Sequence, residues 1–189
     1  GASGYTGAEA IRIALGHPHV EIVALTGESK AGKTIDEVYP HLAGFGLPSL
    51  VKIEDVSLAG LDAVFLCLPH ATTQRVAKTM RTAAPYLRLI DLSADFRLRD
   101  VAAYEDWYGE HFAPEYQSEA VYGLTEHYRA EIKDAPIIAC PGCYPTSILV
   151  PLLALQNAGL IDPSRIIADS KSGTTGAGRK SSEALSHSE

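Results

Sequence analysis

Short apolar runs alternate with amphipathic stretches along most of this chain. The runs read as buried strands over residues 20–26, 63–68, 88–92 and 137–140. Between them, apolar residues recur at helical spacing, most clearly over residues 8–15 and 72–83. Apolar strands that are separated by helices are typical of parallel sheets. The pattern therefore predicts an α/β fold with a doubly wound parallel sheet.

The pattern changes in the last quarter of the chain. An apolar stretch over residues 146–158, ended by Gly159, predicts a strong helix, and residues 165–170 read as one more strand. Residues 51–53 are a weaker strand candidate, whereas residues 104–116 show no clear period. We expect the final elements to begin a second domain.

Composition excludes several classes of protein. With 46% hydrophobic and 21% charged residues and a mean hydropathy of +0.02, the chain is an ordinary globular sequence. A net charge of −7 without a basic run argues against a nucleic-acid partner. The apolar runs are too short to span a bilayer and no signal peptide opens the chain, so we expect no membrane partner.

The cysteines indicate a reducing compartment. Cys67, Cys140 and Cys143 are too few and too unevenly placed for a secreted disulfide framework, so a cytoplasmic location fits better. Cys140 and Cys143 have C-x-x-C spacing, which also occurs in redox and zinc sites. Because no second pair follows, we expect no metal site here.

A glycine-rich turn runs directly into the first predicted helix. Without Cβ atoms, its backbone can let a pyrophosphate approach the helix N-terminus, where free N–H groups favour anions. The turn predicts a dinucleotide site in a Rossmann-like domain, although a plain strand-to-helix turn is the alternative. The candidate cofactor-binding residues of this turn are Gly1, Ser3, Gly4, Tyr5, Thr6 and Gly7.

Residues after the strand at 20–26 bear on the choice between NAD and NADP. Ser29, Lys30 and Lys33 could hold a 2′-phosphate, whereas Glu28 could oppose it. A solvated loop would have the same composition. We favour NADP, with Ser29 and Lys30 as cofactor-binding residues.

Two further strands end in polar motifs, on the side where ligands collect in open α/β sheets. Pro69 and His70 follow one strand and Ser93 follows the other, which makes them candidate cofactor contacts. A surface histidine is equally compatible with the pattern, and Ser93 and Asp95 could instead cap a following helix. Arg97 is a candidate for binding a carboxylate or phosphate of the substrate, with a surface ion pair as the alternative.

Cys143 lies between the strand at 137–140 and the helix that begins near Thr146. Amides at a helix N-terminus stabilise an anion, which favours the nucleophilic thiolate. Pro141 and Gly142 shape a turn that can present the sulfur, and Pro145 suits a first helical turn. We therefore expect Cys143 to be a catalytic nucleophile rather than a buried structural cysteine.

The polar loop at residues 169–180 is rich in glycine, hydroxyl groups and basic side chains. It can bind an anion or accommodate a nicotinamide ring near the backbone, although a flexible connector would look similar. We expect Ser172 and Gly173 to contact the cofactor and Arg179 to contact the substrate.

Taken in order, these motifs resemble the N-acetyl-gamma-glutamyl-phosphate reductase family of arginine biosynthesis. The resemblance covers nearly the whole chain, and its most specific motif is Pro-Gly-Cys-Tyr-Pro-Thr at residues 141–146. The other similar stretches are residues 1–7, 68–70, 92–97, 122–126 and 169–179. Cys140 departs from the family, which commonly has asparagine before Pro-Gly-Cys.

The resemblance implies reduction of an acyl phosphate by NADPH through a thioester on Cys143. It also implies that residues 1–142 are an NADP-binding Rossmann-like domain and that residues 143–189 begin an α+β catalytic and dimerisation domain. The chain would then be a fragment, lacking the first strand and much of the C-terminal domain, with little activity alone. The family's general acid/base histidine cannot be placed, and the nearby His187 lacks its motif.

Other functions remain open at this point. A sister acyl-phosphate reductase of lysine biosynthesis would share the chemistry, and a non-catalytic NADP-binding module would share the turn at residues 1–7. For the full-length enzyme, the resemblance implies a homo-oligomer.

Overall fold

The computed structural model describes residues 1–179, which fall into two compact units. Unit 1 contains Gly1–Ser57 together with residues 171–179. Unit 2 contains Leu58–Ser170. Because the two units are separate bodies, each is described by itself.

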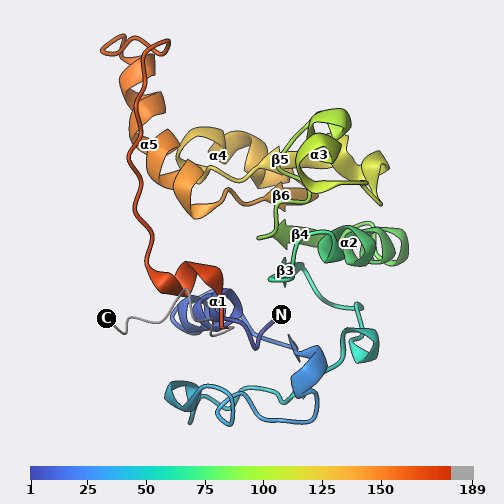
Figure 1. The fold of residues 1–189 in the computed structure, drawn as a ribbon. Helices are drawn as coiled ribbons and strands as arrows, with labels where there is room; N and C mark the ends of the chain where they lie inside the picture. Colours follow the sequence, from blue (N-terminus) through green and yellow to red (C-terminus); the bar gives the residue numbers. More distant parts are fainter. Residues whose placement is uncertain (180–189) are drawn as a thin grey trace. The chain divides into compact units, whose positions relative to one another are not determined.

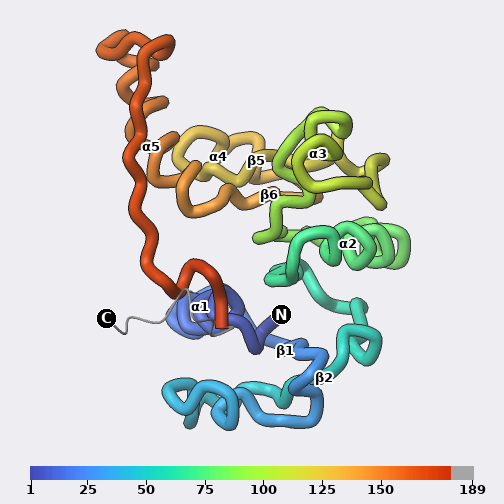
Figure 2. The backbone as a smooth tube through the Cα atoms, in the orientation of Figure 1, coloured from blue at the N-terminus to red at the C-terminus, as the bar shows by residue number. Residues whose placement is uncertain are grey.

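Unit 1 packs the helix α1 (Tyr5–Leu15) with a short parallel ladder of β1 (Leu25–Thr26) and β2 (Leu50–Val51), traced in Figure 2. Short 3-10 turns η1 (Glu28–Lys30), η2 (Pro40–Leu42), η3 (Ile53–Asp55) and η5 (Thr174–Ala177) occur in the loops. The apolar core consists of Ala2, Ala8, Ile11, Leu25, Ile35, Tyr39, Leu42 and Leu50.

The strand predicted over residues 20–26 is shorter in the structure. Only its last two residues pair with β2, and Val23, which precedes them, is 59% exposed. The weaker candidate at residues 51–53 is present as β2, one residue earlier. The apolar β-branched residues at 20–26 therefore predict a longer strand than the structure forms.

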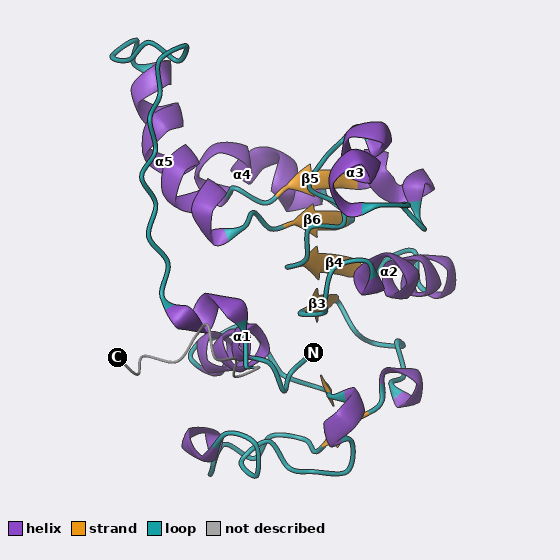
Figure 3. Cartoon of the chain, viewed as in Figure 1, coloured by secondary structure: helices purple, strands orange, loops and turns teal. Residues whose placement is uncertain are grey.

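Unit 2 contains a four-stranded sheet in the order β3-β4-β6-β5, seen side by side in Figures 1 and 3. Its strands are β3 (Ala63–Leu66), β4 (Arg88–Asp91), β5 (Ala120–Tyr122) and β6 (Ile137–Ala139). Every strand pair is parallel, which confirms the predicted α/β class with a Rossmann-like parallel sheet. The central strands β4 and β6 bury Leu89 and Ile137 completely.

Four helices belong to unit 2: α2 (Thr72–Ala83), α3 (Val101–Tyr108), α4 (Thr125–Asp134) and α5 (Cys143–Asn157). In α2 the buried residues Thr73, Gln74, Ala77 and Met80 recur at spacings of one to three positions and form a single face. The boundaries of α2 were predicted correctly, and α5 was predicted to begin three residues later than it does. Gly159 follows α5 in the left-handed region, with φ of +68°.

Three expectations from the pattern were incomplete or wrong. Residues 104–116, which have no clear period, contain the end of α3 and the start of the 3-10 helix η4 (Pro114–Glu119). The short strand β5 and helix α4 were not predicted. The strand expected at 165–170 is not formed, because no described strand pairs with it, and Ile167 is 99% exposed.

Across residues 1–179, no helix combines the length and apolar character needed to cross a membrane.

Candidate active site

The glycine-rich turn of unit 1 has the close packing that its sequence predicts. The N–H of Ala2 donates to the carbonyl of Thr26 at 2.8 Å, which ties the turn to β1. A Cβ atom added at Gly7 would lie 2.4 Å from the carbonyl oxygen of Gly1, so only glycine fits this position. The N-cap of α1 is Gly4, which provides no side-chain cap. Amides at the start of α1 are therefore suited to a phosphate group.

A second set of contacts braces the turn at Ser3. Its carbonyl accepts hydrogen bonds from the Tyr39 hydroxyl at 3.0 Å and from Arg179 Nη1 at 2.9 Å. The Arg179 guanidinium also lies 5.0 Å from the centre of the Tyr39 ring. These contacts place Arg179 on the predicted nucleotide turn, so they support a role beside the nucleotide more than the expected role in binding the substrate.

The other predicted cofactor residues of unit 1 lie in or beside short turns, where Lys30 is half-buried and the others are exposed. Ser29 and Lys30 belong to η1, which follows β1 after Gly27. The neighbouring Gly27 lies close to the glycine-rich turn, because a Cβ added there would be 3.4 Å from Ser3 Oγ. Ser172 and Gly173 are exposed and precede η5.

In unit 2, the turn after β4 is held by a ladder of hydrogen bonds around Ser93. The Asp91 carboxylate accepts from the Ser93 N–H at 2.8 Å and from its hydroxyl at 2.9 Å. The same hydroxyl oxygen accepts from the Asp95 N–H at 3.1 Å. Ser93 is buried, and its hydroxyl both donates and accepts a hydrogen bond inside the turn. Its side chain therefore has a structural role and gives the predicted cofactor contact no support.

Burial raises the pKa of Asp91 to about 6, against the lowering effect of its hydrogen bonds to Ser93. The carboxyl group is completely buried at the carboxyl end of β4. Nearby Cys140 also has a raised pKa, about 11, caused first by burial and then by the charge of Asp91. Cys140 is therefore a protonated thiol near neutral pH.

Arg97 braces the turn that precedes Cys143. Its Nε donates to the Cys140 carbonyl at 2.7 Å and its Nη2 donates to the Leu92 carbonyl at 3.0 Å. The Nη1 atom lies against Gly142, where an added Cβ would be 3.3 Å away. Arg97 thus connects the end of β4 to the end of β6 and keeps one guanidinium nitrogen close to the residue before Cys143.

Cys143 is the first residue of α5 and is exposed. The preceding residue, Gly142, is the N-cap and provides no side-chain cap. Thr146 closes the first turn, because its N–H and its hydroxyl both donate to the Gly142 carbonyl, at 2.9 and 2.8 Å. The thiol therefore lies at the positive end of a helix with its sulfur accessible.

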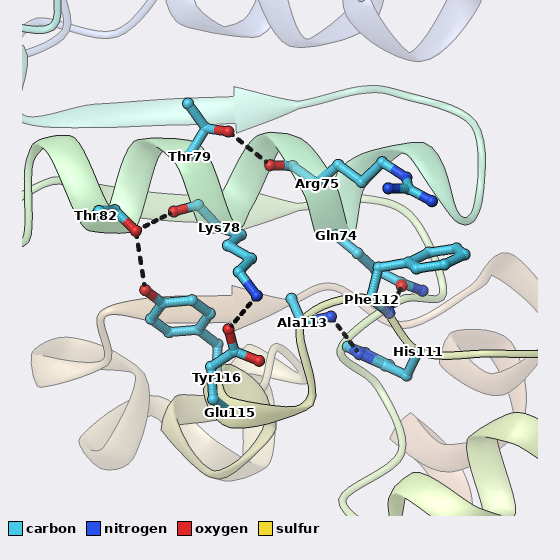
Figure 4. Close-up of polar contacts among 10 residues, drawn as sticks. All are labelled: Gln74, Arg75, Lys78, Thr79, Thr82, His111, Phe112, Ala113, Glu115 and Tyr116. Atoms are coloured by element: carbon cyan, nitrogen blue, oxygen red, sulfur yellow. Dashed lines mark hydrogen bonds and ion pairs between the residues drawn. The ribbon is translucent and has the colours of Figure 1, made fainter.

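Sequence reasoning missed a polar network between α2 and residues 111–116, which is buried at His111 and exposed at Lys78 (Figure 4). The Phe112 N–H donates to Gln74 Oε1 at 2.6 Å, and the Ala113 N–H donates to His111 Nδ1 at 3.1 Å. Lys78 forms an exposed ion pair with Glu115 at 2.7 Å. The signal of this network in the sequence is a polar residue, Gln74, at helical spacing from the apolar residues Ala77 and Met80.

Two sequence models match the chain. The semialdehyde dehydrogenase NAD-binding domain matches residues 1–135, and the semialdehyde dehydrogenase dimerisation domain matches residues 143–189. The chain belongs to the semialdehyde dehydrogenase family. The first match contains the glycine-rich turn and most of the sheet, and Cys143 is the first residue of the second match.

Curated relatives of this semialdehyde dehydrogenase chain are named N-acetyl-gamma-glutamyl-phosphate reductases, as the motifs suggested. Proteins with this name from Arabidopsis thaliana (termed probable and chloroplastic) and Afipia carboxidovorans are each 52% identical to the chain over its whole length. A third, from Rhodospirillum rubrum, has the same identity. The chain covers 47%, 54% and 54% of these relatives, so it spans about half of their length.

Proposed function

We propose that this chain is the nucleotide-binding and nucleophile-bearing part of an NADPH-dependent reductase that converts N-acetyl-glutamyl 5-phosphate to the 5-semialdehyde. The observation that carries the proposal is the placement of Cys143, exposed at the first position of α5 within the motif Pro-Gly-Cys-Tyr-Pro-Thr. The shared name of the relatives supports the choice of substrate.

The glycine-rich turn fits a nicotinamide dinucleotide. Its Cβ-free packing at Gly7 and the uncapped start of α1 suit the pyrophosphate. Ser29 and Lys30 on η1 would hold a 2′-phosphate, which is why we propose NADP rather than NAD. Bound there, NADPH supplies the hydride. We place Arg179 with this group, because it contacts Ser3.

Covalent catalysis would begin at Cys143. The Cys143 thiolate attacks the acyl carbon of the acyl phosphate, a C–S bond forms, and inorganic phosphate leaves. Hydride addition to the thioester carbon, followed by protonation of the oxygen, gives a thiohemiacetal. The C–S bond then breaks to release the aldehyde and regenerate the thiol. The exposed position of Cys143 at the start of α5 leaves the sulfur open to the substrate.

Arg97 would serve this chemistry in two ways. Its bonds to the Leu92 and Cys140 carbonyls hold the turn that presents the sulfur. Its remaining nitrogen, Nη1, would bind an oxygen of the departing phosphate. A general acid/base is also needed. His187, the histidine that follows the cysteine motif in the sequence, lies outside the described residues.

The proposal extends to the complete protein. We propose a cytoplasmic homo-oligomer, because residues 143–189 match a dimerisation domain and all three cysteines are free. The domain boundary at residue 142/143 is part of the same proposal. Neither a nucleic acid nor a membrane is proposed as a partner.

Substitution of the nucleophile tests the proposal in the complete protein. Cys143→Ser should abolish NADPH oxidation with N-acetyl-glutamyl 5-phosphate, and Cys140→Ser, the matched control, should retain most of it. Brief incubation with the acyl phosphate, without NADPH, should give an acyl adduct on Cys143 by peptide mass spectrometry. Replacing NADPH by NADH should lower kcat/KM.

Other outcomes separate the alternatives. A higher kcat/KM with the one-carbon-longer or carrier-linked acyl phosphate would favour the sister reductase of lysine biosynthesis. Tight NADPH binding without acylation of Cys143 would favour a non-catalytic module. Full activity of Cys143→Ser would overturn the thioester mechanism.

A further inference from the structure

The turn between β3 and α2 contains a strained residue. Ala71 has φ of 64° and ψ of −17°, and it is the only residue other than glycine with a positive φ within residues 1–179. An alanine in the left-handed region costs about 1 kcal/mol or more relative to the right-handed region. This conformation persists only if the surrounding structure holds it.

Asp95, on the loop after β4, stabilises this conformation by hydrogen bonds. Its Oδ1 accepts the N–H of Ala71 at 2.9 Å, and its Oδ2 accepts the N–H of Gln74 at 3.2 Å. The carboxylate therefore caps the start of α2, where Ala71 itself provides no side-chain cap. Asp95 is completely buried, so water does not compete for these bonds.

The carboxylate is itself fixed by a chain of buried hydrogen bonds. The Tyr104 hydroxyl donates to Asp95 Oδ1 at 3.0 Å, and Gln74 Nε2 donates to the Tyr104 oxygen at 2.7 Å. The other end of the Gln74 amide accepts the Phe112 N–H, as Figure 4 shows. Tyr104 and Gln74 are completely buried. Each bond restricts the next, so the carboxylate has one orientation.

The residue held next to Ala71 is His70. Its Nδ1 accepts the N–H of Ala94 at 2.8 Å, so in the neutral ring the proton is on Nε2. The bond from Ala94 to His70 and the bond from Ala71 to Asp95 join the same two turns side by side. His70 is exposed. These two bonds thus fix the tautomer of His70, whose exposed Nε2–H lies beyond the carboxyl end of β3.

We propose that Asp95 is a positioning residue, which holds the Ala71 turn so that His70 presents its Nε2–H to the bound nicotinamide nucleotide. This inference rests on the proposed function, in which the chain binds NADPH, and on the sequence-based expectation that His70 contacts this cofactor. Asp95 itself touches neither nucleotide nor substrate in this role.

The test uses the complete protein and four variants. In Asp95→Asn, one carboxylate oxygen becomes an amide that faces a backbone donor. Ala71→Gly adopts the turn without strain and is combined with Asp95→Asn to keep that protein folded. His70→Ala removes the ring, which assigns its signals and takes away the donor. Asp100→Asn, a conservative change at the exposed cap of α3, is the matched control.

We expect the unmutated protein to show an unprotonated Nδ1 for His70 by nitrogen NMR. Asp95→Asn should lose this single tautomer and weaken NADPH binding by about tenfold, the effect of one lost hydrogen bond in a polar site. The same factor should appear in KM for NADPH, with kcat at saturation little changed. Adding Ala71→Gly should restore part of both, whereas Asp100→Asn should match the unmutated protein.

A folded Asp95→Asn protein with an unchanged His70 tautomer and an unchanged Kd for NADPH would overturn the inference. The same holds if His70→Ala binds NADPH as tightly as the unmutated protein. If the unmutated protein binds no NADPH, the proposed function and the ligand named here both fail. In that case the His70 tautomer in Asp95→Asn still decides whether Asp95 positions the ring.

Discussion

At the scale of single residues, burial changes the pKa of two side chains at the ends of β4 and β6. Asp91 is completely buried and Cys140 is partly buried, and both favour their protonated forms compared with water. Cys143, only three residues beyond Cys140, is exposed at a helix start. The protein thus separates an inert thiol from an accessible one within a single turn.

The raised pKa of Asp91 predicts a pH dependence of stability. The folded value is about 6 and the usual value is 3.8, so the folded state binds more protons between these two pH values. Stability should therefore fall as pH rises through this window, by about 3 kcal/mol for two pKa units. Urea unfolding of Asp91→Asn should lack this component, so the difference between the two proteins should change between about pH 4 and pH 6. A constant difference would contradict the burial argument.

The three cysteines should differ in their reaction with iodoacetamide. Burial raises the pKa of Cys67, as it does that of Cys140, and both thiols are partly buried. We expect peptide mass spectrometry near pH 8 to find rapid alkylation of Cys143 and slow alkylation of the other two. Labelling of all three should become comparable only after denaturation in urea. Equal rates in the folded protein would contradict the structure.

At the scale of elements, capping by side chains locates two helices in different ways. Asp100 caps its own helix, α3, because its Oδ1 accepts the Ala102 N–H at 2.9 Å. Asp95 was considered as a cap for a following helix, but it caps the preceding helix, α2. Only a tertiary contact between the turns after β3 and β4 makes the second arrangement possible.

Removal of the Asp100 cap should lower the free energy of unfolding modestly, and a conservative substitution should avoid most of the loss. Asp100→Ala leaves the Ala102 N–H without its side-chain acceptor, and we expect a loss of about 1 kcal/mol in the free energy of unfolding. Asp100→Asn should preserve most of the stability, since asparagine is an equally good cap. Urea denaturation of the three proteins measures both effects. A loss of equal size in both variants would indicate that the charge, rather than the cap, is what matters.

At the scale of the whole molecule, the glycine-rich turn lies in unit 1 and Cys143, the proposed nucleophile, lies in unit 2. The described residues offer no histidine hydrogen-bonded to Cys143, and the chain spans about half of its relatives. We therefore expect this polypeptide alone to turn over N-acetyl-glutamyl 5-phosphate far more slowly than the complete protein. Parallel assays of the two, each with and without Cys143→Ser, measure this difference. Equal Cys143-dependent rates would show that residues 1–189 suffice.

The sequence by itself predicted much of this protein, because the relevant signals are local. Apolar runs separated by helical periods specify a parallel α/β fold, glycines at spacings of three residues specify a close-packed turn, and Pro-Gly before Cys143 specifies a strand-to-helix junction. Short elements such as β5 escaped prediction, since three residues contain too little periodicity to recognise.

Tertiary structure alone decided which polar residues are buried together. The hydroxyl of Ser93, a predicted cofactor contact, forms hydrogen bonds to Asp91 and Asp95 within its own turn. The segment at 165–170 has strand composition but no described neighbour with which to pair. Asp95 holds Ala71 across 24 residues of chain. Such outcomes depend on hydrogen-bond partners that are distant in sequence, and the identity of a residue does not reveal its partner until the chain is folded.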